Sequence, residues 1–113
     1  MKRTTLTTAL SAPALLLAMH AAHAAPQAHV VCGYSHTLGD DAIMMFGRPN
    51  EAMLHDFFGN THTDASSTRE TLRTLEETTC DNKADSSAYW APSLRLPDGT
   101  IVKPAYHKTY YQA

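Results

Sequence analysis

The first 24 residues constrain the fold most, because they have the features of a secretory signal peptide and would be removed before folding. Two basic residues precede an apolar stretch over residues 6–19, and Ala22-His23-Ala24 places small residues where a signal peptidase cleaves. A serine and a proline interrupt the stretch, so it falls short of the roughly 20 continuous apolar residues of a membrane span. The sequence therefore predicts a secreted or periplasmic protein, without a stable membrane span, in which residues 25–113 form one small domain.

The charge of that domain argues against nucleic acid as a partner. Once residues 1–24 are removed, 11 acidic residues stand against seven lysines and arginines, a net charge of −4 with histidines neutral. Binding to nucleic acid depends on basic side chains that neutralise phosphates. We predict no nucleic-acid partner, and the sequence leaves the oligomeric state open.

Two cysteines, Cys32 and Cys80, lie in the domain. An even number of cysteines in a small exported chain predicts a disulfide. Closing a loop between positions 48 residues apart would contribute about 4 kcal/mol, a large share of the roughly 5–10 kcal/mol expected for such a domain. Two free thiols, or half of a metal site, are the alternative, although neither cysteine belongs to a Cys-x-x-Cys pair.

The remaining pattern predicts a mainly β domain, sandwich-like, with one short helix. A helix of about ten residues is expected from Thr68, with Ser67 as N-cap and Glu70 completing a capping box. The turn Pro97-Asp98-Gly99 predicts a hairpin. The expected strands are Val30–Tyr34, Ala42–Phe46, the chain from Ala88 onward, the hairpin arms 94–96 and 100–102, and the aromatic segment Tyr106–Tyr111; Glu51–Phe58 is ambiguous between helix and strand.

A series of short motifs resembles a family of secreted fungal and bacterial proteins, the domain of unknown function nineteen-ninety-six. The motifs occur in the family order and are Cys32, Tyr34-Ser35-His36, Asp40-Asp41, His55 to Asn60, Thr78-Thr79-Cys80, Ser87 to Trp90, Pro92 and Tyr110-Tyr111. The chain looks like the N-terminal part of the family domain, either as a short member or as a truncated one. The resemblance implies an unassigned activity on or near polysaccharide surfaces, because family members are secreted and are often joined to sugar-binding modules.

One departure from the family pattern bears on a metal site. Where the pattern has His-x-His, this chain has Met53-x-His55. Two histidines at that spacing on a strand would point to one face and could chelate Zn or Cu, with His36 as a further ligand. The alternative is that His55 is a hydrogen-bonded structural residue beside the phenylalanines. No cofactor is predicted, and a metal of unidentified type stays an alternative.

The same segment suits proton transfer or sugar binding. A histidine beside carboxylates is a typical acid–base pair, so the candidate catalytic residues are His55, Asp56, Asp41 and His36. Asn60, Tyr89 and Trp90 are the candidate ligand-binding residues, although aromatic residues on strands are more often core, and Trp90 is the strongest candidate for a core anchor.

We therefore expect His36, Asp41 and His55 to converge. The favoured function is association with extracellular or envelope polysaccharide. A polysaccharide-active enzyme, a metal-binding protein and a degenerate non-catalytic fragment are the alternatives.

Overall fold

The fold is described by a computed structural model, which places residues 1, 2, 4, 5, 7–9 and 27–112. Most of the apolar segment of the expected signal peptide, and its cleavage site, lie outside the described residues. Among the residues that are described, no helix is long and apolar enough to cross a membrane.

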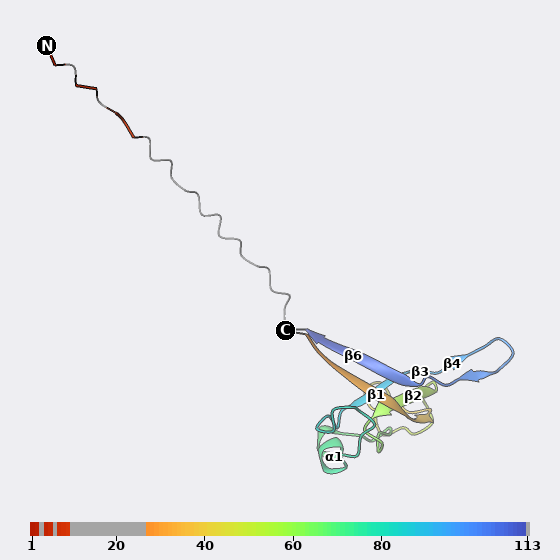
Figure 1. The fold of residues 1–113 in the computed structure, drawn as a ribbon. Helices are drawn as coiled ribbons and strands as arrows, with labels where there is room; N and C mark the ends of the chain where they lie inside the picture. Colours follow the sequence, from red (N-terminus) through yellow and green to blue (C-terminus); the bar gives the residue numbers. More distant parts are fainter. Residues whose placement is uncertain (3, 6, 10–26, 113) are drawn as a thin grey trace.

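The described domain is mainly β, with one short helix and one disulfide, as the sequence predicts. A four-stranded antiparallel sheet has the order β3-β2-β1-β6, and β4 and β5 form a separate two-stranded ribbon (Figure 1). The elements are β1 (Gln27–Leu38), β2 (His55–Gly59), α1 (Arg69–Thr74), β3 (Ala88–Pro92), β4 (Leu94–Arg95), β5 (Ile101–Val102) and β6 (Tyr106–Gln112).

The long strand β1 belongs to two ladders, which curls the sheet. Its first half, Gln27–Gly33, pairs with β6, and its second half pairs with β2. A bulge separates Tyr34, opposite Phe58, from His36, opposite Phe57. Because the bulge adds one residue to β1, the side chains of Tyr34 and His36 lie on opposite faces of the sheet.

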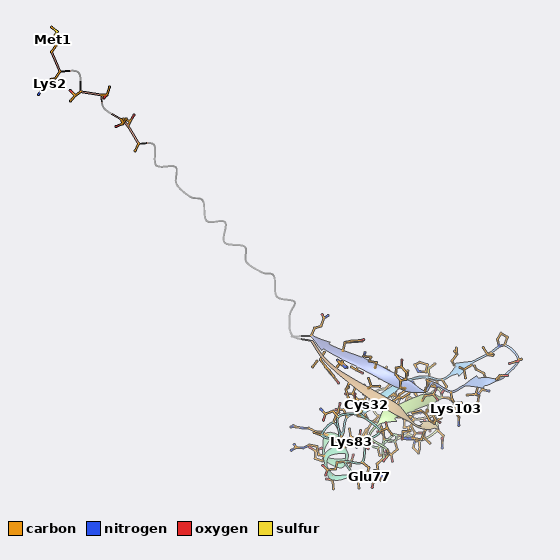
Figure 2. The ribbon with its side chains drawn as sticks, viewed as in Figure 1. Met1, Lys2, Cys32, Glu77, Lys83 and Lys103 are labelled. Carbon is orange, nitrogen blue, oxygen red and sulfur yellow. A yellow bond between two sulfur atoms is a disulfide. The ribbon has the colours of Figure 1, made fainter. Side chains whose placement is uncertain are left out.

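The concave inner face of the sheet carries the apolar core. Val30, Cys32, Phe58 and Cys80 are buried together, and Tyr34 and Tyr89 pack against them. The predicted disulfide joins Cys32 to Cys80 inside this cluster, within the strand-rich part of the domain (Figure 2). The disulfide therefore stabilises the domain both through its buried sulfur atoms and through the loop that it closes.

The segment that carries Cys80 is tied to both central strands. The hydroxyl of Thr79 donates to the carbonyl of Gly33 at 2.6 Å and accepts from the amide of Gly59 at 2.9 Å. Gly59 has a φ of +81°, and a Cβ there would lie 2.4 Å from the carbonyl oxygen of Ser87. A side chain is therefore excluded at this position by both the backbone conformation and the close neighbour.

The expected strand at Ala42–Phe46 is wrong, because these residues form turns. One carboxylate oxygen of Asp41 accepts the amides of Ile43 and Met44, each at 2.9 Å, and the Asp41 carbonyl accepts the amide of Met45. These local bonds occupy the amides that a strand would offer to a neighbour. The apolar side chains of Ile43 and Met44 are consequently exposed.

The helix is shorter than predicted and its cap lies one residue later. Thr68, not Ser67, is the N-cap, and Thr71 completes the capping box in place of Glu70. The hydroxyl of Thr71 reaches the N-cap amide at 2.9 Å. The hairpin around Asp98 and the aromatic strand β6 are confirmed, and the ambiguous segment resolves into a loop followed by β2.

Candidate functional site

The outer face of β2 and β3 carries an aromatic cluster around Phe57, which is 1% exposed. The ring of His36 stacks on Phe57 with centroids 4.9 Å apart and planes at 1°. The ring of His55 meets Phe57 edge-on at 6.4 Å, and Trp90 tilts against it at 5.8 Å. The strand register places Trp90 directly opposite Phe57, so the cluster follows from the alternation of side chains along paired strands.

His36 is held by two hydrogen bonds in this cluster. Its Nε2 lies 2.7 Å from the carbonyl oxygen of Thr63, and its Nδ1 lies 2.7 Å from the hydroxyl of Ser35. A carbonyl only accepts, so Nε2 carries the proton and Nδ1 accepts from the serine. Neither ring nitrogen is left open for a metal or a substrate, and His36 holds the loop that contains Thr63 on the sheet.

His55 differs from His36 in having one open nitrogen. It is 6% exposed, and its Nδ1 lies 3.0 Å from the carbonyl oxygen of Asp40. Nδ1 therefore carries the proton, which leaves the lone pair on Nε2 in the neutral ring. None of the described residues hydrogen-bonds to Nε2, so His55 can act as an acceptor or a base on this face.

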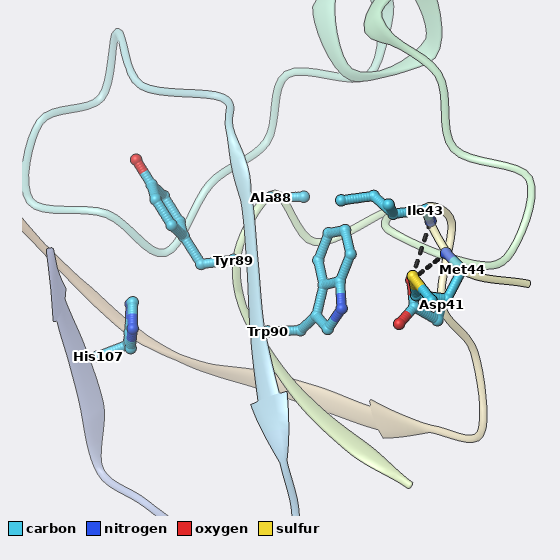
Figure 3. Close-up of a pocket in the computed structure, with 7 residues that line it drawn as sticks. All are labelled: Asp41, Ile43, Met44, Ala88, Tyr89, Trp90 and His107. Atoms are coloured by element: carbon cyan, nitrogen blue, oxygen red, sulfur yellow. Dashed lines mark hydrogen bonds between the residues drawn. The ribbon is translucent and has the colours of Figure 1, made fainter. Parts of the chain in front are cut away.

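Asp41 lies near His55 at the start of the turn that follows β1. Hydrogen bonds from the amides of the turn, that of Met44 foremost, lower the pKa of Asp41 below its ordinary value of 3.8, and the nearby His55 and the indole of Trp90 lower it further, while burial opposes them. One carboxylate oxygen accepts both turn amides, and the other accepts neither. The second carboxylate oxygen of Asp41 lies beside the indole of Trp90, as Figure 3 shows.

Trp90 is half-buried and stands between two depressions of the surface. One, of about 400 Å³, is lined by Asp41, Met44 and Trp90, with Tyr89 and His107 across β3 (Figure 3). The other, of about 390 Å³, is lined by Trp90 and by residues of the helix region, including Arg69 and Leu72. Trp90 is thus not the buried core anchor that the sequence favoured. Phe57 and Phe58 on β2 have that role, because β2 is an inner strand covered on both faces, whereas β3 is an edge strand.

Asn60 is not placed to touch a ligand. It is fully buried, and its amide nitrogen lies 3.2, 2.7 and 3.1 Å from the carbonyl oxygens of Leu72, Leu75 and Ser86. Its side-chain oxygen accepts the amide of His62 at 2.9 Å. Asn60 therefore joins the end of α1 to β2 and to the segment before β3, which is a structural role.

Asp56 and Tyr89 lie on the opposite, inner face. Asp56 follows His55 directly in β2, and successive side chains of a strand alternate between faces, so the two do not share a site. The hydroxyl of Tyr89 donates to a carboxylate oxygen of Asp85 at 2.8 Å and also contacts the hydroxyl of Tyr111. Burial and these two hydrogen bonds raise the pKa of Tyr89 well above its ordinary 10.0.

The arrangement of the described side chains does not support a metal site at His55 and His36. Within residues 27–112, no group of three or more histidine, cysteine, aspartate or glutamate side chains could hold a metal ion. Met53 lies in the loop before β2 and is 64% exposed, so it does not share the strand face of His55. Of the sequence-predicted residues, Asp41 and Trp90 line one depression together, and His55 lies near Asp41 with its Nε2 not hydrogen-bonded to any described residue.

His107 is a residue of the site region that the sequence analysis did not single out. It lies on β6 opposite Cys32, and its ring contacts those of Phe58 and Tyr89 at 5.4 and 5.7 Å. The alternation of His107, Thr109 and Tyr111 along the expected aromatic strand could have indicated a common inward face.

A comparison with protein families gives one match. The family model described as "Domain of unknown function (DUF1996)" matches residues 41–113, more than half of the chain. No curated protein and no solved structure matches the chain. The matched residues include Asp41, His55 and Trp90.

Proposed function

We propose, for a chain that belongs to the DUF1996 family, that the outer face around Trp90 binds an extracellular or envelope polysaccharide. The observation that carries the proposal is the placement of a half-exposed indole between two depressions, with the second carboxylate oxygen of Asp41, which accepts no turn amide, beside it. The protein is proposed to be exported, for which the N-terminal segment and the disulfide are the supporting features.

The chemistry of the face suits a sugar ring. An aromatic surface offers an apolar platform for the C–H face of a sugar, and nearby polar groups accept hydrogen bonds from its hydroxyls. At Trp90 the acceptor is the second carboxylate oxygen of Asp41, a residue that lines one of the two depressions, whereas His55 lines neither. Trp90 lines both depressions, so a chain of several sugar residues could continue from one side of the indole to the other.

The chain contains a single tryptophan, which makes the test direct. Titration with soluble β-glucan, galactan and chitosan oligosaccharides should change Trp90 fluorescence for the polysaccharide that binds. Pull-down on insoluble cellulose, chitin and β-glucan should then lose binding in Trp90→Ala and weaken by about tenfold in Asp41→Asn, which removes one charged acceptor.

Tyr110→Ala is the matched control, because Tyr110 is an aromatic residue that is 57% exposed on β6 and lines neither depression. Equal retention of the parent, Trp90→Ala and Tyr110→Ala proteins on every polysaccharide would reject the proposal.

A polysaccharide-active enzyme is the second candidate, favoured by the open Nε2 of His55 beside Asp41. An enzyme would release new reducing or unsaturated ends from the polysaccharide that is bound, and His55→Gln would abolish this release while retention on the polysaccharide persists. Retention without any release of ends would assign the face to binding alone.

A further inference from the structure

A further cavity lies on the inner face of the sheet and shares the side chain of His107 with the depression of about 400 Å³ beside Trp90. It has a volume of about 220 Å³ and is lined by residues of β2, β3 and β6 and of the β4–β5 ribbon. Most of its wall is apolar, with Phe58, Leu94, Val102 and Pro104 contributing. Asp56 and His107 are the titratable side chains in the wall.

Asp56 is a buried carboxylate with one oxygen uncommitted. The residue is 2% exposed, and its Oδ1 accepts the hydroxyls of Thr37 at 2.7 Å and Ser93 at 2.9 Å. None of the described residues donates to Oδ2. Among the described side chains no fully buried polar atom lacks a partner, so Oδ2 keeps contact with open space, and the cavity is the space that Asp56 lines.

No cationic side chain of the described residues neutralises Asp56. The ion pairs found within residues 27–112 join Arg48 to Glu51 and His62 to Glu77. Lys103 lies at the base of the ribbon (Figure 2), but its ammonium sits 5.3 Å from the centroid of the Tyr34 ring and forms no ion pair with Asp56. Two hydroxyls donate to Oδ1, but no cation of the described residues offsets the charge of this carboxylate, and burying an unpaired charge is costly.

We propose that this cavity binds a small ligand that combines an ammonium group with a compact apolar body. The ammonium donates to Oδ2 of Asp56, and the body packs against Phe58, Leu94 and Val102. The hydroxyls of Thr37 and Ser93 orient the carboxylate from behind, because both bind the oxygen that the ligand does not use. The apolar wall disfavours a polyol, which would leave several hydroxyls without partners, and the carboxylate disfavours an anion.

Two-dimensional amide NMR of the ¹⁵N-labelled protein at pH 7 tests the site with two probes of the same shape. Cyclohexylammonium should give saturable shifts at the amides of Asp56, Ala91, Val102 and His107, which surround the cavity. Cyclohexanol, which lacks the positive charge, should bind about tenfold more weakly. Equal affinities, or shifts confined to other parts of the protein, would overturn the proposal.

Two variants act on different parts of the cavity. Asp56→Asn keeps the shape and the Oδ1 acceptor but removes the charge, and should weaken cyclohexylammonium binding by about tenfold. Ala91→Leu fills the cavity from β3, directly opposite Asp56, and leaves the charge of Asp56 in place, so it should abolish binding of both probes. If Asp56→Asn fails to fold, Ala91→Leu and the comparison of the two probes still decide. Trp90→Ala should leave probe binding unchanged, so this site can fail or hold independently of the polysaccharide face.

Discussion

Replacing Asn60 by alanine tests how the helix is attached to the sheet. The substitution removes two amide hydrogens that serve three carbonyl groups and one oxygen that accepts the amide of His62. We count two hydrogen bonds donated by the two amide hydrogens and one accepted by the oxygen. At about 1 kcal/mol for each of these three, the free energy of unfolding should fall by about 3 kcal/mol. The loss is larger where water cannot reach the abandoned groups, and Asn60 itself is 0% exposed.

Urea unfolding with the disulfide intact measures this loss, followed by the fluorescence of Trp90 and by circular dichroism. A small domain loses about 1 kcal/mol of stability per molar urea, so the midpoint should move down by about 3 M. Asn60→Asp keeps the acceptor for His62 but turns an oxygen toward the three carbonyls. It should destabilise at least as much as alanine, although its volume matches asparagine.

Asn82→Ala is the matched control, since Asn82 is exposed and its side chain accepts one local amide, that of Ala84. Its effect should stay within about 0.5 kcal/mol. A loss below 1 kcal/mol for Asn60→Ala would refute the structural role. If Asn60→Ala lost retention on polysaccharide while its stability was unchanged, Asn60 would instead be a ligand-binding residue.

Three further predictions concern the disulfide and two titrating groups. Replacing Cys32 and Cys80 together by serine should lower stability by about 4 kcal/mol in the same urea assay, and a change below 1 kcal/mol would contradict the loop-closure argument. Because the pKa of Asp41 is lowered, its contribution to stability should be complete above pH 3.8 and be lost as the pH falls through its lower pKa in the folded protein. A titration of the Asp41 carboxyl carbon by NMR with a midpoint at or above pH 3.8 would contradict the hydrogen bonds from the turn amides. Because the pKa of Tyr89 is raised, its contribution to stability should be complete below pH 10 and be lost as the pH rises toward its pKa in the folded protein. The difference in absorbance at 295 nm between the parent and Tyr89→Phe proteins should therefore stay flat up to pH 10. A rise at lower pH would argue against the contacts of Tyr89 with Asp85 and Tyr111.

Features that depend on neighbours in the chain could be predicted from the sequence. The hairpin at residues 97–99 follows from a proline that presets φ and from Gly99, whose φ is +89°. The region of the helix start was also predictable, although several threonines and serines compete for the cap and the sequence does not rank them. The pairing of the cysteines followed from their number alone, because only one bridge can form within the chain.

The candidate site depended on contacts that no local pattern records. The apolar run at 42–46 predicts a strand, but the carboxylate of Asp41 captures the amides that would have paired. The bulge in β1 places His36 on the outer face, and its bond to the carbonyl of Thr63, 27 positions away, then closes its last open nitrogen. In the family motif His55 to Asn60, the sequence shows a run of polar and aromatic residues without indicating which atoms stay free.

The sequence by itself thus determined the class of fold, the bridge and the composition of the site, because these depend on residue type and spacing. Only the tertiary structure decided which polar groups are available. The Nδ1 of His55 donates to the carbonyl of Asp40, and the side-chain amide of Asn60 donates to carbonyls at the end of the helix. The Oδ1 of Asp56 accepts the hydroxyls of Thr37 in β1 and of Ser93 after β3. A group becomes available for a ligand when the folded chain leaves it without a partner, and those partners come from segments distant in sequence.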